Sequence, residues 1–155
     1  MKSICIKRAT IADVPDLSLL FDQYRVFYRK ESDIDGAVSF LTDRLTREES
    51  VVFLCESESR IVGFVQLYPL FSSTKMQRLW LLNDLFVVPA FRGQGVSKTL
   101  IEACRTFASQ TGACGLSLET EKTNNIANQL YISTDWELDE DHNFYFLSTN
   151  LSKQK

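Results

Sequence analysis

Two glycines, Gly93 and Gly95, lie between an apolar run and a run with helical spacing, and this junction is suited to binding an anion. The apolar run from Leu79 to Val88 is rich in aromatic and β-branched residues, as strands are, and Pro89 ends it. After Gly95, apolar residues recur at spacings of three and four, which predicts a helix. The first N–H groups of such a helix have no intrahelical partner and lie at its positive end, so the junction favours a phosphate group.

The common nucleotide-binding patterns do not fit this junction. A P-loop needs glycine directly before Lys-Ser/Thr, but Ser97 precedes Lys98 and Thr99 here. The dinucleotide fingerprint needs a third glycine where Lys98 stands. A tight turn without a ligand is the simplest alternative, and the glycine pair alone favours it.

Two segments resemble the GNAT superfamily of acyl-CoA-dependent N-acetyltransferases. Arg92-Gly93-Gln94-Gly95-Val96-Ser97 resembles the pyrophosphate loop of that family, Arg/Gln-x-x-Gly-x-Gly/Ala, with serine in the last place. The segment from Asn124 to Trp136 resembles the family's Asn-x-x-Ala-x-x-Leu-Tyr-x-x-x-Gly-Phe, with Asp135 and Trp136 replacing the closing Gly-Phe. Residue-level similarity covers about 83–136, and the order of elements matches over nearly the whole chain.

The resemblance implies an enzyme that moves the acetyl group of acetyl-CoA to a primary amine, without a metal. In the family the coenzyme lies along the exposed edge of the fourth strand, on the glycine loop and against the second conserved segment. The corresponding residues are Leu85, Phe86, Val87, Arg92, Gly93, Gln94, Gly95, Val96, Ser97, Lys98, Asn124 and Ala127. Asn124 is also expected to cap its helix.

Three residues are candidates for catalysis: Asn83, Asp84 and Tyr131. An alkyl amine has a pKa near 10.4, so releasing its proton at pH 7 costs about 4.6 kcal/mol, and a base must cover that cost. Polyamine acetyltransferases of the family carry Glu-Asp where this chain has Asn83-Asp84, so one carboxylate is missing. Strand alternation favours a structural role for Asp84 and a water oriented by Asn83 as the route for the proton, whereas a bulge would turn Asp84 inward as the base. Tyr131 matches the family's acid for the departing thiolate.

The acceptor is expected to be a small molecule, such as a polyamine or an amino-acid-like amine. Bulky aromatic residues indicate a closed pocket, and Tyr28, Phe71 and Trp80 are predicted to contact the substrate. An acidic group formed by Glu31, Asp33 and Asp35 either attracts a cation or is a solvated turn. The alternatives are a protein N-terminal or lysine acetyltransferase and a non-catalytic acyl-CoA-binding regulatory domain.

Composition excludes several other classes of protein. The chain has 155 residues and a net charge of −3, which predicts one domain and no nucleic-acid or anionic-membrane partner. No apolar run reaches the ~20 residues of a membrane helix, and Met1 leads directly into a strand pattern, so a cytoplasmic location is expected. The four cysteines lie in apolar segments without a Cys-x-x-Cys pair, which predicts buried free thiols.

The periodicity predicts an α/β fold in the order β-α-α-β-β-β-α-β-α-β-β, and the resemblance implies a mixed, mostly antiparallel sheet with helices on both faces. The domain is expected to span residues 1–151, with a frayed tail over 152–155. The last two strands are expected near 136–138 and 144–148. Because Phe144-Tyr145-Phe146-Leu147 would form an aromatic open edge, a homodimer is also expected.

Overall fold

The computed structural model describes residues 3–150, and the chain forms two compact units, Met1–Glu121 and Lys122–Lys155, which are described one at a time. The first unit is a five-stranded sheet in the order β1-β2-β3-β4-β5, antiparallel except for the last pair. Its strands are β1 (Ile4–Arg8), β2 (Val51–Ser57), β3 (Arg60–Ser72), β4 (Gln77–Val87) and β5 (Leu116–Ser117). Its helices are α1 (Val14–Phe27), α2 (Ile34–Thr46) and α3 (Val96–Gln110).

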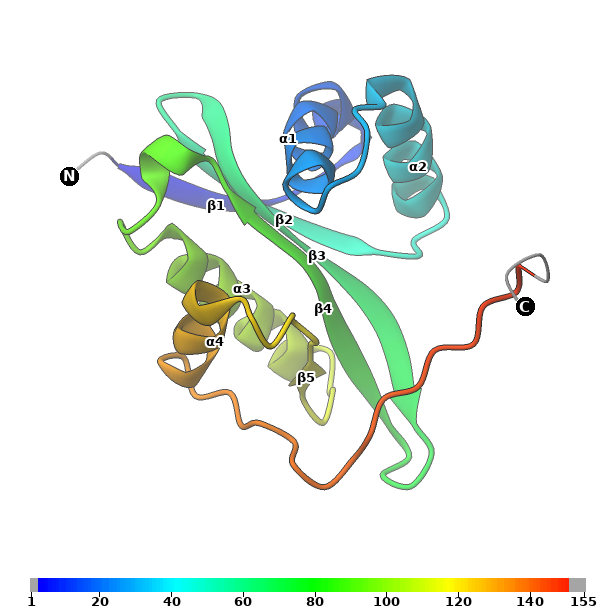
Figure 1. Ribbon diagram of the computed structural model, residues 1–155. Helices are drawn as coiled ribbons and strands as arrows, with labels where there is room; N and C mark the ends of the chain where they lie inside the picture. Colours follow the sequence, from blue (N-terminus) through cyan, green and yellow to red (C-terminus); the bar gives the residue numbers. More distant parts are fainter. Residues whose placement is uncertain (1–2, 151–155) are drawn as a thin grey trace. The chain divides into compact units, whose positions relative to one another are not determined.

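Helices cover both faces of this sheet: α1 and α2 lie on one face and α3 on the other (Figure 1). Against α1 and α2, a buried cluster includes Leu17, Leu41, Leu54 and Phe64. The apolar stripe predicted for α3 is buried in the structure, with Leu100, Ile101, Cys104 and Ala108 on that side. Because helices cover both faces of the sheet, apolar residues occur in β2 and β3 almost without the alternation of apolar and polar residues that a sheet with one exposed face shows.

A capping box lies just before α1. The Thr10 amide donates to Asp13 Oδ2 at 2.8 Å, and this capping box begins a 3₁₀ turn (Ile11–Asp13) that leads into α1. At the start of α2, Asp33 accepts a hydrogen bond from the Gly36 amide at 2.9 Å. One acid of the Glu31, Asp33 and Asp35 group is therefore a helix cap.

The C-terminal unit contains α4 (Asn125–Ile132), and no strand follows it within the described residues. The predicted strands at 136–138 and 144–148 are therefore wrong for this structure. Asp139 accepts hydrogen bonds from the amides of Asp141 and His142, and this local turn competes with strand pairing. A lone two-stranded pair is also marginally stable in water. The predicted tail, 152–155, lies outside the described residues.

Two further expectations concern cysteines and charge. All four cysteines are free, but Cys5 is exposed and Cys114 is half-buried, so only Cys55 and Cys104 meet the expectation of buried thiols.

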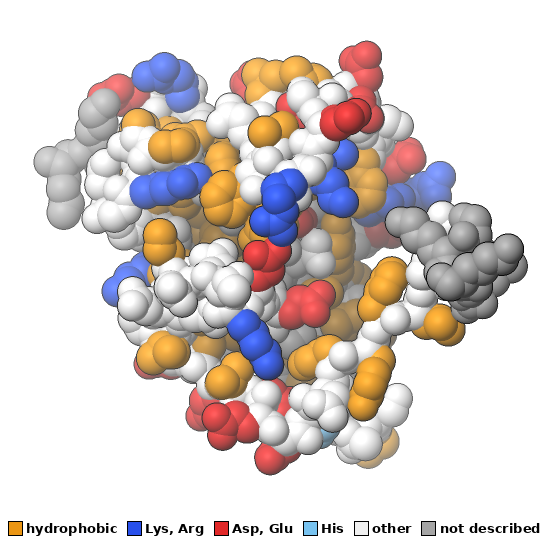
Figure 2. Space-filling view, in the orientation of Figure 1, with side chains coloured by type: hydrophobic (Ala, Val, Ile, Leu, Met, Phe, Trp, Pro, Cys, Tyr) orange, Lys and Arg blue, Asp and Glu red, His pale blue; other side chains and the backbone are white. Residues whose placement is uncertain are grey.

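On the face drawn in Figure 2, Lys and Arg side chains are interspersed with Asp and Glu and form no continuous basic surface over the described residues. None of the helices between residues 3 and 150 has the length and hydropathy to cross a membrane.

Candidate active site

A cleft of about 440 Å³ opens where β4 and β5 separate. The two strands pair only at Trp80–Leu116 and Leu81–Ser117, and no described strand pairs with this edge of β4 beyond Leu81. The cleft is lined by side chains from α1, β4 and the segment after β5: Tyr24, Tyr28, Leu81, Leu82, Asn83, Glu119, Thr120 and Glu121. It therefore lies beside the free edge along which the coenzyme is expected.

A β-bulge shapes β4 at this point. Gln66 pairs with Asp84 and Leu67 pairs with Leu82, so Asn83 is an extra residue opposite β3. The bulge exchanges the faces of the strand, because Trp80 packs against Phe107 of α3 whereas Phe86 packs against Tyr24 of α1. Asp84 accordingly faces the α1 side, where it is buried. The sequence left two possibilities for Asp84: strict alternation along the strand, or a bulge that turns it inward. The structure contains the bulge.

Asp84 and Gln66 are buried, and they form a hydrogen-bonded group with the exposed Asn83 and the half-buried Tyr24. Gln66 Nε2 donates to Asp84 Oδ2 at 2.7 Å, and Asn83 Nδ2 donates to Asp84 Oδ1 at 3.0 Å. The Tyr24 hydroxyl hydrogen-bonds to Asp84 and lies 3.4 Å from the Asn83 carbonyl oxygen. Burial raises the pKa of Asp84 above its ordinary value, and these three hydrogen bonds offset only part of that rise.

Tyr24 of α1 and Tyr28, which directly follows the helix, form the aromatic wall of the cleft. The rings of Tyr24 and Tyr28 meet edge to face at 5.0 Å, and Tyr24 also packs against Phe64 and Phe86. Burial, together with the charges of Glu121 and Asp84, raises the pKa of Tyr28, so its hydroxyl remains protonated at neutral pH. Tyr28 lines the cleft, and its contact with the substrate stays a prediction.

The acidic side chains at the cleft are Glu119 and Glu121, and none of Glu31, Asp33 and Asp35 lines it, which favours a solvated turn for that group. Arg29, directly after α1, donates to Glu121 Oε1 at 2.9 Å, so an ion pair joins α1 to the segment after β5. Sequence reasoning missed the two glutamates, although both follow a short strand at a splayed edge. It also missed Gln66, whose signal is a polar residue inside the apolar run 61–70.

Phe71 and Trp80 do not line this cleft, contrary to the prediction. Phe71 is 73% exposed near the end of β3, where it stacks with Arg78. Trp80 lies on the α3 face because it precedes the bulge, and its indole N–H donates to Thr111 Oγ1 at 2.9 Å. Neither residue is retained as an acceptor contact.

The glycine loop is preformed for a phosphate. Gly93 and Gly95 have φ values of 72° and 83°, and space is open where a side chain would begin at either residue. The first helical hydrogen bond of α3 runs from the Thr99 amide to the Gly95 carbonyl, which leaves the amides of residues 96–98 without intrahelical acceptors. Lys98 is exposed beside them. These residues fit the diphosphate of a coenzyme.

Arg92 is exposed, and its side chain contacts the end of β4. Its Nε donates to the Val87 carbonyl at 2.8 Å, and its guanidinium lies over the rings of Phe27 and Phe86. The Gln94 side chain similarly donates to the Ala90 carbonyl at 2.9 Å. Arg92 therefore fixes the end of β4 relative to α1.

Gly63 allows β3 to approach the same loop closely. A Cβ at Gly63 would lie 3.0 Å from the Phe86 carbonyl oxygen and 3.2 Å from Val96 Cγ1. This agrees with the close packing expected of a glycine inside a strand. The free edge of β4, with Leu85, Phe86 and Val87, is thus held next to the start of α3.

Within the C-terminal unit, Asn124 caps α4 as predicted, because its Oδ1 accepts from the Ala127 amide at 3.1 Å. Tyr131 packs edge to face against Trp136, with ring centroids 5.8 Å apart. Asp135 has a φ of 65°, a conformation that favours glycine, and it occupies the place where the related segments carry glycine.

The comparisons with known proteins agree with this geometry. The model of the Acetyltransferase (GNAT) family matches residues 17–133. An uncharacterised N-acetyltransferase of Bacillus subtilis, YhfO, is 43% identical over 143 residues, which cover 92% of this chain and 96% of that protein. The crystal structure of a probable acetyltransferase is 35% identical, with a TM-score of 0.89 over 93% of this chain and 97% of the other.

A third relative is an aminoglycoside acetyltransferase from a soil metagenomic sample, whose structure was solved in complex with sisomicin. It is 26% identical, with a TM-score of 0.79, and the match covers 94% of this chain and 97% of that protein. The fold and the site define an acyltransferase. This chain belongs to the GNAT family and is an acetyltransferase.

Proposed function

We propose that this protein transfers the acetyl group of acetyl-CoA to a primary amine of a small molecule. The observation that carries the proposal is the cleft at the β4 bulge. A buried carboxyl, Asp84, lies one hydrogen bond behind Asn83 and Tyr24, which line the cleft. Removing a proton from an amine requires a base, and Asp84 is shielded from water but connected by these hydrogen bonds to the cleft where the amine would bind.

The donor is bound by backbone groups. The diphosphate of acetyl-CoA lies on the amides of residues 96–98, and its pantetheine arm follows the free edge of β4. A backbone N–H of Phe86 or Val87 stabilises the oxyanion that forms on the thioester carbonyl. These roles depend little on side-chain identity, so they are compatible with Ser97 in the last place of the loop pattern.

The reaction forms a bond between the amine nitrogen and the acetyl carbon and breaks the carbon–sulfur bond. The amine proton passes to Asp84 through the Tyr24 hydroxyl or a water held by Asn83. Because burial raises the pKa of Asp84, this carboxyl is a stronger base than an exposed aspartate. Tyr131 protonates the coenzyme thiolate as it leaves.

Several features favour a small cationic acceptor over a protein. The volume of the cleft suits a small molecule, and the ion pair between Arg29 and Glu121 bridges α1 and the segment after β5. Glu119 and Glu121 attract an amine cation. The relative solved with sisomicin, a molecule with several amines, supports the same class of acceptor.

Coenzyme thiol release measured with a panel of acceptors tests the proposal. The panel contains polyamines, aminoglycosides, amino acids and peptides that present a free N-terminus or a lysine. We expect turnover with small amines and none with peptides. Turnover confined to peptides would favour the protein acetyltransferase alternative, and acetyl-CoA binding without turnover on any amine would favour the non-catalytic one.

A further inference from the structure

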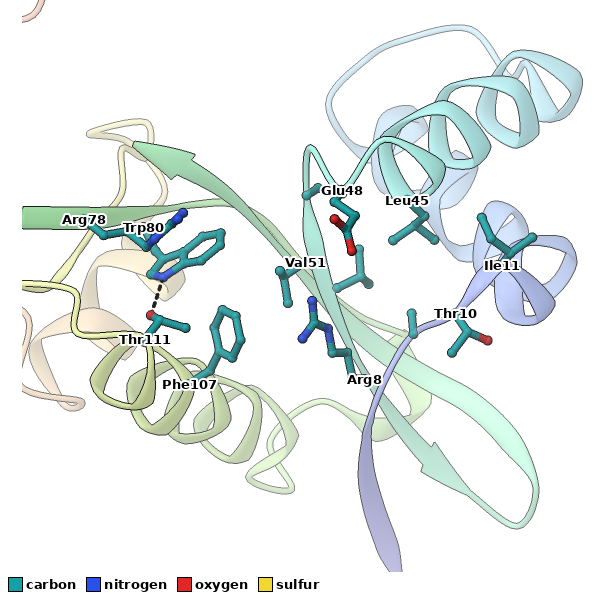
Figure 3. Close-up of a pocket in the computed structure, with 13 residues that line it drawn as sticks. Arg8, Thr10, Ile11, Leu45, Glu48, Val51, Arg78, Trp80, Phe107 and Thr111 are labelled. Atoms are coloured by element: carbon teal, nitrogen blue, oxygen red, sulfur yellow. Dashed lines mark hydrogen bonds between the residues drawn. The ribbon is translucent and has the colours of Figure 1, made fainter. Parts of the chain in front are cut away.

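A second cavity of the first unit, about 690 Å³ in volume, is drawn in Figure 3 and shares no lining residue with the acetyl-transfer cleft. Trp80, at the start of β4, and Phe107 and Thr111, at the end of α3, form part of its wall. The glycine loop is at the other end of α3, roughly 20 Å away for a helix of this length. The coenzyme site therefore does not account for this cavity.

Two arginines in the cavity wall are held in place by aromatic rings and have no acidic partner. Arg8 lies over the ring of Phe107 at 5.3 Å, and Arg78 lies over that of Trp80 at 5.2 Å. Neither guanidinium pairs with a carboxylate or donates a hydrogen bond to any residue between 3 and 150. Their donors are available to an oxyanion.

The aromatic rings between the two arginines form a fixed surface. The centroids of Trp80 and Phe107 are 5.0 Å apart. The Trp80 indole N–H donates to Thr111 Oγ1, which in turn donates to the Ala108 carbonyl at 3.0 Å. Trp80 is only 5% exposed, so this side of the cavity is apolar and rigid.

A carboxylate faces this surface from the opposite wall. Figure 3 shows the side chains of Glu48 and Arg8 pointing toward one another into the cavity, although they form no ion pair. Glu48 follows α2 with a φ of 53°, a backbone conformation that favours glycine. A glutamate at this position therefore has an unfavourable conformational free energy. Ser50, in the same wall, is buried, and its hydroxyl has no hydrogen-bond partner among the described residues.

From this arrangement we propose that the cavity binds a small amino acid with an apolar side chain. Arg8 and Arg78 hold its carboxylate, Glu48 holds its ammonium group, and its side chain lies on the Trp80–Phe107 surface. The cavity has the volume of a small-molecule site, and the opposed charges match a zwitterion rather than a simple anion. This proposal is independent of the acetyl-transfer assignment.

Tryptophan fluorescence without acetyl-CoA tests the proposal. The chain has two tryptophans, so Trp136→Phe leaves Trp80 as the only reporter. The probes are L-phenylalanine, L-phenylalaninamide, which lacks the carboxylate, and 3-phenylpropanoate, which lacks the ammonium group. We expect saturable binding of L-phenylalanine at millimolar concentrations, and binding at least about tenfold weaker for each analogue.

Calorimetry on variants of the full chain measures how much each proposed contact contributes to binding of the amino acid. Arg8→Gln and Arg78→Gln should weaken L-phenylalanine binding about tenfold, whereas Arg60→Gln, the same charge change at the start of β3, should leave it unchanged. Glu48→Gln should bind L-phenylalanine and 3-phenylpropanoate alike. No saturable binding, equal binding of the three probes to the Trp136→Phe protein, or equal effects of Arg8→Gln and Arg60→Gln would overturn the proposal.

Discussion

Asn83 and Asp84 are adjacent in sequence but differ in environment, and this difference separates their roles. Asn83 lines the cleft, whereas Asp84 is 4% exposed and receives hydrogen bonds from Gln66 and Asn83. Ionisation of a buried carboxyl costs free energy, so the folded protein favours its protonated form. The stability that this form contributes is present below the ordinary pKa of aspartate and is lost as the pH rises through the raised pKa.

Asp84→Asn is expected to lower kcat/KM by about 10²- to 10⁴-fold and to remove the acidic limb of the pH–rate profile. It should not lower the melting temperature at neutral pH, because asparagine is uncharged and avoids the cost of burying a carboxylate. The Gln66 amide can turn so that its Oε1, now without a described partner, accepts from the new amide. Steady-state rates across pH, together with thermal unfolding, check both parts.

Asp43→Asn is the matched control, because Asp43 is exposed on α2 away from the cleft. It should change neither the rate nor the pH profile. If Asp84→Asn instead melts at a much lower temperature and keeps the pH profile of the parent protein, Asp84 is structural, as strand alternation alone had favoured.

Tyr131→Phe is expected to lower kcat roughly ten- to a hundredfold while leaving acetyl-CoA affinity nearly unchanged. A hydroxyl that protonates the leaving thiolate acts mainly in the transition state, so its loss appears in kcat. Stopped assays with a saturating amine and calorimetry with coenzyme A measure the two quantities. Tyr145→Phe, at an exposed tyrosine of the same unit, is the control, and an unchanged kcat in Tyr131→Phe would leave Tyr131 as a packing residue beside Trp136.

At the scale of elements, the sequence predicted the strand–loop–helix junction closely, because the apolar run from Leu79 to Val88 corresponds to β4 at Gln77–Val87. Apolar periodicity and the glycines determine where β4 ends and α3 begins, and both are local signals. The bulge at Asn83 could not be predicted in this way, because it depends on how β4 registers with β3. Trp80 was predicted to contact the substrate, whereas the register before the bulge places it against Phe107 of α3.

Gly95→Val is expected to weaken acetyl-CoA binding by at least about tenfold. A side chain at Gly95 would enter the open space in front of the unpaired amides of α3 and would strain a backbone with φ of 83°. Gly112→Val is the matched control, since Gly112 follows α3 with φ of 69° and also has open space around it. Calorimetry on both folded variants separates backbone strain from blocked binding, and equal affinities would remove the basis for the coenzyme site.

The end of α2 offers a prediction about stability. Glu48→Gly is expected to raise the free energy of unfolding by roughly 0.5–1 kcal/mol, because glycine adopts the left-handed conformation after a helix without strain. For a chain of this length, that corresponds to about 1–4 °C in Tm. Denaturant unfolding measures it, and Arg47→Gly, one residue earlier with ordinary φ, should destabilise the protein instead. A less stable Glu48→Gly would mean that the carboxylate itself supports the fold.

At the scale of the whole molecule, the family, the class of enzyme and the order of elements up to α4 follow from the sequence, whereas the C-terminal region does not. The resemblance predicted two final strands, but residues 136–150 form none in the described structure. Pairing of these residues depends on contacts distant in sequence, while the Asp139 turn depends only on its neighbours. The domain boundary at 151 and the cytoplasmic location stay predictions.

A homodimer is the last prediction, and the C-terminal unit gives it a physical basis. Within that unit Phe144, Tyr145, Phe146 and Leu147 are all exposed, between 77% and 94%, and four consecutive exposed apolar residues are unusual on a monomer. Burying a Phe side chain contributes about 1.5–3 kcal/mol, so a second copy of the chain that covers this segment gains a substantial driving force.

We expect light scattering to give the mass of a dimer at micromolar concentration. Phe144→Ser with Phe146→Ser should shift the mass to the monomer, whereas Ile126→Ser, which removes an equally exposed apolar side chain from α4, should not. A monomer mass at every concentration, or a dimer that survives the double substitution, would show that this segment does not join two chains.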